Sequence, residues 1–159
     1  MNEALPRQTY RTESDGENEE RIAELFAQWA RAKQLKIGKD DPDKQKPRID
    51  RLLYRQHVVA FFEIKTCSYA WGYWSRGWCT GRAKVELLRQ LASIVRVPVL
   101  LVVEFDYGTL GYVDVNTEYA EIADFGRDDR ADRADREPGA LFNWGKLNRC
   151  NQPRSRSNE

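Results

Sequence analysis

Residues 57–66, HVVAFFEIKT, are the stretch that decides the fold of this chain of 159 residues. Apolar and β-branched side chains dominate the stretch, as is typical of a buried β-strand. Successive side chains of a strand point to opposite faces, so Glu63 and Lys65 share one face near its carboxyl end. An acid and a base therefore lie side by side at the end of an otherwise apolar strand.

The segments around this strand predict an α/β domain. Apolar residues recur at helical spacing on two sides of it, and further apolar runs have strand length. The predicted elements are, in order, a helix over 17–34, a strand over 47–54 in a hairpin with 57–66, a helix over 82–95, and strands over 97–105 and 110–115. We expect a mixed β-sheet that opens with an antiparallel hairpin and is flanked by helices, in α-β-β-α-β-β order.

Composition divides the chain into three regions. Residues 1–16 lack periodicity and are predicted to form an N-terminal arm, followed by a core over 17–120. Residues 121–159 are predicted to form a charged C-terminal extension. Its run RDDRADRADRE (127–137) repeats Arg and Asp at a spacing that suits either a charged helical turn or a solvated segment.

Charge and cysteine content exclude several classes of protein. The chain has 26 Lys+Arg against 25 Asp+Glu, and no apolar run approaches the roughly 20 residues of a membrane helix. Its three cysteines form no C-x-x-C pair and are expected to be reduced thiols. We therefore expect a cytoplasmic protein with no membrane partner. Residues 65–100 carry six basic side chains against one acid, a local excess that suits a polyanion.

Polar residues interrupt the predicted hairpin where chemistry is expected. Asp50 lies in the first strand, and Glu63 and Lys65 lie near the end of the second. Burying carboxylates among apolar side chains is costly unless a charge compensates them, and a divalent metal ion is one such charge. A lysine beside the ion could orient or help to deprotonate a bound water. Such a group could therefore cleave a phosphodiester bond.

At these residues the chain resembles the PD-(D/E)XK nuclease superfamily, which has the restriction-endonuclease-like fold. The pattern is an Asp, a spacer, and then Glu-x-Lys at the end of a strand, here Asp50 and Glu63-Ile64-Lys65. The order of the predicted elements matches over about residues 17–116. The proline that usually stands beside the Asp is missing, because the local sequence is Pro47-Arg48-Ile49-Asp50.

The resemblance implies metal-dependent cleavage of DNA with Mg²⁺ or Mn²⁺ as cofactor. Asp50 and Glu63 would be the main metal ligands, with the backbone carbonyl of Ile64 as a further ligand. Lys65 would position the attacking water. The resemblance also implies an acid on the first helix that supports the metal or its water.

Helical spacing favours Glu19 as that acid, because it precedes Ile22 by three residues and Phe26 by seven. Glu20 is the second candidate, and Glu17 also stays open.

A second set of residues is predicted to contact DNA. Aromatic rings interleaved with arginines can stack unpaired bases and hold phosphates. The predicted contacts are Trp71, Trp74, Arg76, Trp78, Arg82 and Lys84. The alternatives are hydrophobic packing or a dimer contact for the aromatic rings, and a solvated helix-start lysine for Lys84.

Three functions follow from these residues. The first is a metal-dependent deoxyribonuclease, specific for DNA structure or strandedness, in repair, recombination or phage DNA processing. The second is a non-catalytic nucleic-acid-binding protein on the same fold. The third is a protein-interaction module that uses the Trp-rich segment and has no salt-dependent affinity for DNA. Formation of a homodimer stays open.

Overall fold

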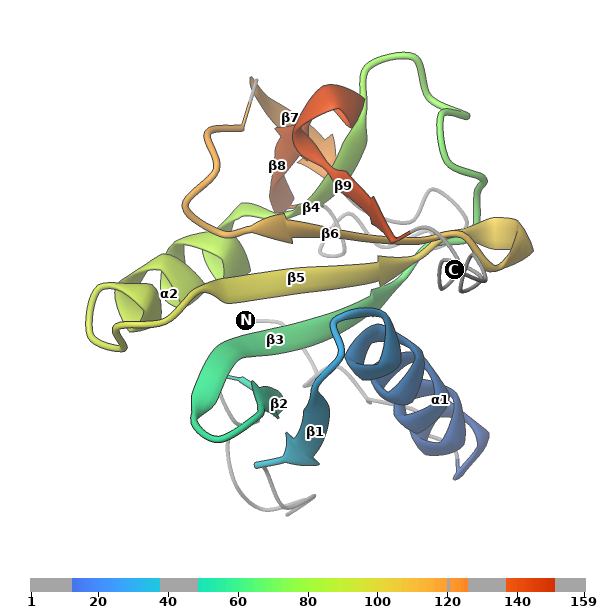
Figure 1. Cartoon of the computed structure of the whole chain (residues 1–159). Coiled ribbons are helices and arrows are strands. Elements are labelled where there is room, and N and C mark those ends of the chain that lie inside the picture. The colour runs from blue at the N-terminus through green and yellow to red at the C-terminus, as the bar shows by residue number, and fades with distance from the viewer. Residues whose placement is uncertain (1–12, 38–48, 120, 126–136, 151–159) are drawn as a thin grey trace, which may run out of the picture.

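The computed structural model describes residues 13–37, 49–119, 121–125 and 137–150 (Figure 1). The helices are α1 (Glu13–Trp29) and α2 (Arg82–Ala92), with short 3-10 turns η1 (Asp106–Gly108) and η3 (Trp144–Lys146). The strands are β1 (Lys33–Lys36), β2 (Arg51–Tyr54), β3 (Val58–Thr66), β4 (Trp78–Gly81), β5 (Val99–Glu104), β6 (Leu110–Asp114), β7 (Glu121–Phe125), β8 (Glu137–Phe142) and β9 (Asn148–Cys150). Neither helix of these ranges is long and apolar enough to cross a membrane.

A mixed sheet of six strands forms the centre of the molecule, in the order β1-β2-β3-β5-β6-β9. β3 and β5 run parallel, joined by a crossover through α2, and the other neighbours run antiparallel. A second, three-stranded sheet has the order β4-β8-β7. The predicted fold class, a mixed α/β sheet that is flanked by helices, is confirmed.

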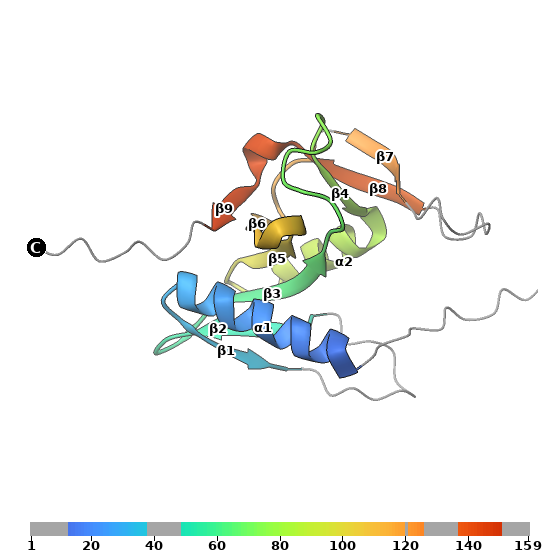
Figure 2. The ribbon, with the colours of Figure 1, turned by 90° about the vertical axis from the view of Figure 1, so that its right-hand side faces the viewer.

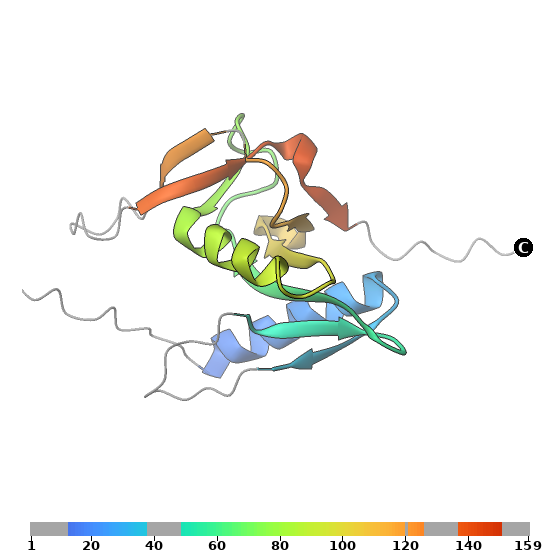
Figure 3. The same ribbon diagram turned by 90° about the vertical axis from the view of Figure 1, so that its left-hand side faces the viewer.

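The two helices cover opposite faces of the central sheet. α1 lies in front of the sheet in Figure 2, and α2 lies in front of it in Figure 3. Alternate side chains of β3 accordingly enter two separate cores, with Phe62 packed beside Phe26 of α1. On the α2 face, Val103 joins Leu88 in the other core. Because the central strands are buried on both faces, their sequences read as continuous apolar runs.

The first helix ends earlier than the predicted residue 34, and the reason is a local hydrogen-bond pattern. The N–H of Ala32 donates to the carbonyl of Ala27 at 2.9 Å, and that of Arg31 donates to Gln28 at 3.1 Å. Arg31 adopts a left-handed conformation, with φ at 53°. This is a Schellman motif built without the usual glycine, so no residue type in the sequence marks the end of the helix. The chain then turns into β1, a strand that the sequence analysis missed.

Three of the described strands, β7, β8 and β9, come from the range predicted as a charged extension. β8 is hydrogen-bonded between β4 and β7, and β9 pairs with β6 at the edge of the central sheet. α1 likewise begins at Glu13, inside the range predicted as an arm. Most of the Arg–Asp run, residues 127–136, lies outside the described residues.

Candidate active site

Glu63 is a buried carboxylate on the α2 face of β3, with 8% of its side chain exposed. Lys65, two residues further along the strand, places its Nζ 3.2 Å from Glu63 Oε1. Lys84, in the first turns of α2, places its Nζ 2.9 Å from Oε2. Strand alternation brings the first lysine to this face, and the packing of α2 brings the second. Two cations therefore offset the cost of burying one carboxylate.

Asp50 directly precedes β2, at the end of that strand where Arg51 pairs with Phe62 of β3. Arg51 pairs with Phe62 in antiparallel register, so the residue before Arg51 is the neighbour of the residue after Phe62. Residues opposite each other in an antiparallel pair point to the same face. The backbone carbonyl of Asp50 also accepts a hydrogen bond from Ile37 at 2.8 Å, which continues the pairing of β1 with β2. Glu63 and Lys65 thus share one face of the sheet, and the β2–β3 register, continued by one residue, would place Asp50 on that face as well.

The donor atoms of this face fit a hydrated divalent cation. Glu63 Oε2 is fully buried and accepts no hydrogen bond of good geometry from the described residues, although Lys84 lies close to it as a charge. No group of three or more His, Cys, Asp or Glu side chains that could hold a metal occurs in the described ranges. Two carboxylates are a usual protein contribution to Mg²⁺, which keeps several waters and binds substrate phosphate. Asp50 and Glu63 are therefore a suitable donor pair.

Ile64 turns its side chain to the α1 face, where it packs in the core of that side. The metal contact predicted for Ile64 concerns its backbone carbonyl and stays a prediction.

The candidate acids of α1 belong to a helix that covers the other face of the sheet. Glu20 accepts a hydrogen bond at 2.7 Å from Arg51, and Gln34 donates to both Glu20 and Glu24 at the same distance. Burial raises the pKa of Glu20, but the hydrogen bonds from Arg51 and Gln34 outweigh it, so the pKa lies below its ordinary value. Glu19 is half-buried on the same helix. The choice of Glu19 as the helix-one acid stays a prediction.

The residues predicted to contact DNA divide into two groups. Trp78 is buried, and its ring stacks on Phe142 with centroids 6.2 Å apart. Trp71 is half-buried, with its ring centroid 5.1 Å from that of Trp144. A base cannot stack on a ring that the core covers, so Trp78 does not belong to an open DNA surface. Trp74, Arg76 and Arg82 are exposed.

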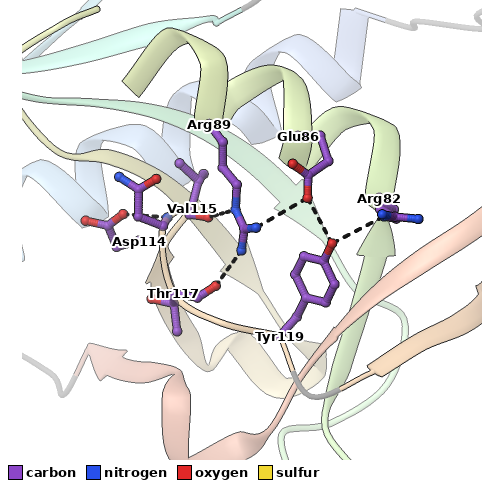
Figure 4. Close-up of polar contacts among 8 residues, drawn as sticks. Arg82, Glu86, Arg89, Asp114, Val115, Thr117 and Tyr119 are labelled. Atoms are coloured by element: carbon purple, nitrogen blue, oxygen red, sulfur yellow. Dashed lines mark hydrogen bonds and ion pairs between the residues drawn. The ribbon is translucent and has the colours of Figure 1, made fainter. Parts of the chain in front are cut away.

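A polar network that the sequence analysis missed holds α2 in place (Figure 4). Arg89 donates to the backbone carbonyls of Val115 at 2.6 Å and Thr117 at 2.8 Å. Glu86 accepts a hydrogen bond from the hydroxyl of Tyr119 at 2.9 Å, and the Arg89 guanidinium lies 4.8 Å from the centroid of the Tyr119 ring. These contacts fasten the helix that carries Lys84 to the turn after β6. No local sequence pattern predicts these contacts, because the partners lie far apart along the chain.

The cysteines do not contribute a nucleophile to this site. Burial raises the pKa of Cys79 to about 11 and that of Cys150 to about 12. Burial also raises the pKa of Cys67. A thiolate is the reactive form of cysteine, and burial disfavours that form in these three thiols.

The fold and this cluster define a protein of the PD-(D/E)XK superfamily: an acid at a strand start, Glu-x-Lys on the next strand, and a mixed sheet between two helices. The model of the family described as "Phage putative PDDEXK endonuclease" matches residues 5–149. The match spans most of the chain, so the chain belongs to this family, which supports a nuclease as the class of protein. No curated protein matches the chain.

Proposed function

We propose that this protein is a metal-dependent endonuclease that hydrolyses phosphodiester bonds of DNA. The observation that carries the proposal is the buried Glu63 carboxylate, held between two lysines, with Asp50 directly before the neighbouring strand β2. A protein with no chemical use for this charge would be expected to bury an apolar side chain there, because the desolvation penalty of a carboxylate is large. Membership of the family supports the same activity.

In the proposed mechanism, Asp50 and Glu63 would hold one or more Mg²⁺ or Mn²⁺ ions, with the carbonyl of Ile64 as a further ligand. Such an ion would supply Lewis acidity to the phosphate and would lower the pKa of a coordinated water. Lys65 orients the attacking water, since its ammonium is already held at the carboxylate by a 3.2 Å ion pair. Its positive charge also stabilises the charge that develops on the phosphate oxygens. Glu19 is our choice for the acid that supports the metal or its water.

Lys84 is the second cation of the site in this proposal. It approaches Glu63 from α2, while Lys65 approaches from the same strand. Both lysines are partly exposed, so both can reach a phosphate that enters from solvent. We propose that Lys84 holds Glu63 in position and attracts the DNA backbone, together with Arg76 and Arg82. The protein would act on DNA in the cytoplasm, in repair, recombination or phage DNA processing.

A cleavage assay tests the proposal. Wild-type protein, Asp50→Ala and the surface control Glu118→Ala are incubated with single-stranded, duplex, flap and four-way DNA in Mg²⁺, Mn²⁺ or EDTA. We expect metal-dependent products from wild type and Glu118→Ala, and none from Asp50→Ala or in EDTA. DNA binding without products from any substrate would instead favour a non-catalytic binding protein. Neither binding nor cleavage would favour a protein-interaction module.

A further inference from the structure

Three aromatic side chains are exposed on two adjacent loops at one end of the central sheet. Tyr73 is 69% exposed, Trp74 is 57% exposed and Tyr107 is 89% exposed. Folding normally removes such rings from water, because each buries a large apolar area. We call these three residues the aromatic ledge.

The ledge is assembled from two segments that hydrogen bonds hold together. Tyr73 and Trp74 lie in the loop after β3, and Tyr107 lies in η1 after β5. The N–H of Asp106 donates to the carbonyl of Tyr69 at 3.0 Å, and the Tyr69 ring lies 6.1 Å from Tyr73 and 6.2 Å from Trp74 between centroids. Figure 2 shows η1 and this loop on the same side of the molecule. The exposed rings therefore belong to one end of the sheet.

The backbone beneath the ledge is fixed. Trp144 Nε1 donates to the carbonyl of Trp74 at 2.5 Å, which ties the loop to η3. Tyr107 has a left-handed backbone, with φ at 63°, and its N–H donates to Asp106 Oδ1 at 3.0 Å. This conformation is unfavourable in a residue other than glycine, and such strain persists where the surroundings over-determine it. An exposed ring on a strained, anchored turn is preorganised for contact.

The ledge also continues from the proposed active site. The strand that carries Glu63 and Lys65 ends at Thr66 and leads directly into the loop of Tyr73 and Trp74. The N–H of Cys67 donates to the carbonyl of Glu104 at 2.8 Å, which joins the ends of β3 and β5. Arg76 is exposed on the same loop and offers a charge for a phosphate. A DNA strand whose phosphate reaches Lys65 would thus run onto the ledge.

We propose that the aromatic ledge stacks unpaired nucleobases, so that the substrate carries a single-stranded segment next to the scissile bond. This inference rests on the proposed nuclease function and specifies its substrate class. Every nucleobase has a flat face that can stack on an aromatic ring, so the contact tolerates any sequence. In a duplex those faces are already stacked on neighbouring base pairs. The ledge therefore favours single-stranded or splayed DNA over intact duplex.

Binding measured in EDTA tests the ledge without cleavage. Wild type, the double variant Trp74→Ser/Tyr107→Ser and the control Ile94→Ser are titrated with a single-stranded oligonucleotide of about 12 nucleotides and with the corresponding duplex. Ile94 is 77% exposed and follows α2. The C-terminal end of α2 and the turn η1 after β5 lie at opposite ends of the central sheet (Figure 1). We expect the double variant to lose roughly tenfold or more in single-strand affinity, and about twofold or less in duplex affinity. Ile94→Ser should bind both like wild type.

A second measurement uses the folded wild-type protein alone. Stacking should quench the fluorescence of Trp74 as the single strand is added, and Trp74→Phe should remove that part of the signal. Equal loss of single-strand and duplex affinity in the double variant, or no loss of either, would overturn the inference. A changed oligomeric state with unchanged DNA affinity would make the ledge a protein contact and would also overturn it.

These outcomes separate the ledge from the nuclease proposal. If the ledge variants selectively lose single-strand affinity while wild type cleaves nothing in any metal, the ledge stands and the catalytic proposal fails. If wild type cleaves DNA and the ledge variants bind and cleave like wild type, the ledge alone fails.

Discussion

Each face of the central sheet buries a charged side chain, and the two side chains differ in the contacts that hold them. On the α1 face, Arg51 is 2% exposed and donates hydrogen bonds to Glu20 and Gln34 at 2.7 and 2.8 Å. On the α2 face, Glu63 is held by two lysine ion pairs, and its Oε2 accepts no hydrogen bond of good geometry from the described residues. Arg51 donates both of these hydrogen bonds through Nη1, and its buried Nε has no hydrogen-bond partner among the described residues. Arg51 is thus held by directional hydrogen bonds at one nitrogen, whereas Glu63 is held by the ammonium charges of two lysines.

The difference indicates which face is architectural and which is chemical. The hydrogen bonds that Arg51 Nη1 donates to Glu20 and Gln34, with that from Gln34 to Glu20, connect α1, β1 and β2. A carboxylate between lysines can exchange those partners for a metal ion or a phosphate, because ammonium groups are mobile and are not bound to one geometry. The two faces should therefore respond differently to substitution, in activity on one side and in stability on the other.

The largest effect is expected from Glu63→Gln, which keeps the shape of the side chain and removes its charge. Cleavage should fall by about a thousandfold or more, because the metal loses a principal ligand. The free energy of unfolding should change little, since the two lysines are partly exposed and can be hydrated. Cleavage rates and urea unfolding of the same preparations measure the two quantities. Wild-type cleavage activity in this variant would contradict the assignment of the chemistry to the α2 face.

The next largest effect is expected on the α1 face, where loss of Glu20 and loss of Arg51 should lower the free energy of unfolding by different amounts. Glu20→Ala leaves the buried Arg51 charge without its counterion and should cost about 3 kcal/mol of unfolding free energy. Arg51→Met should cost less, about 1 kcal/mol, because Glu20 is 53% exposed and water can solvate it. Urea unfolding gives both values, with Glu24→Ala as the control that removes only a hydrogen bond from Gln34. A larger loss of unfolding free energy in Arg51→Met than in Glu20→Ala would contradict this account of the Arg51–Glu20 ion pair.

Substitutions of the two lysines of the α2 face should change different kinetic constants. Lys65→Met should lower kcat by roughly a hundredfold with DNA affinity retained, since the water-positioning group is lost. Lys84→Met should lower kcat/KM by about tenfold, because it removes one screened charge beside Glu63. Single-turnover cleavage together with binding in EDTA measures the chemical step and the affinity. Equal losses of cleavage rate and affinity in the two variants would mean that Lys65 and Lys84 do not have the different roles proposed for them.

The smallest effect is a pH dependence on the α1 face. The pKa of Glu20 in the folded protein lies below 4.5, because hydrogen bonds from Arg51 and Gln34 outweigh the effect of burial. The contribution of ionised Glu20 to the free energy of unfolding is therefore complete above about pH 4.5, and it is lost as the pH falls through the lowered pKa. The difference in unfolding free energy between wild type and Glu20→Gln should be constant from neutral pH to about 5 and shrink below 4.5. A difference that grows on acidification would contradict it.

Sequence patterns predicted the central elements because those elements bury continuous apolar runs. The strands over 57–66 and 97–105 and the helix over 82–95 appear as β3, β5 and α2, with no end shifted by more than three residues. The edge strand β1, KQLK, has no such run and was missed. β4, β7, β8 and β9 were missed as well, since their pairing joins segments far apart in the chain. Short strands with distant partners leave little local signal.

For the candidate site, the alternation of one strand was enough to place Glu63 beside Lys65, because the period of a strand is fixed by its covalent geometry. The sequence also determined the fold class, through the order and burial of its apolar segments. Only the tertiary structure decided that Lys84 meets Glu63, that Arg51 is enclosed by α1, and that Tyr107 joins the ledge. Each of these depends on which distant elements pack together, and local propensity does not encode that choice. The same packing buries Trp78 and leaves Trp74 exposed, although both belong to one aromatic segment.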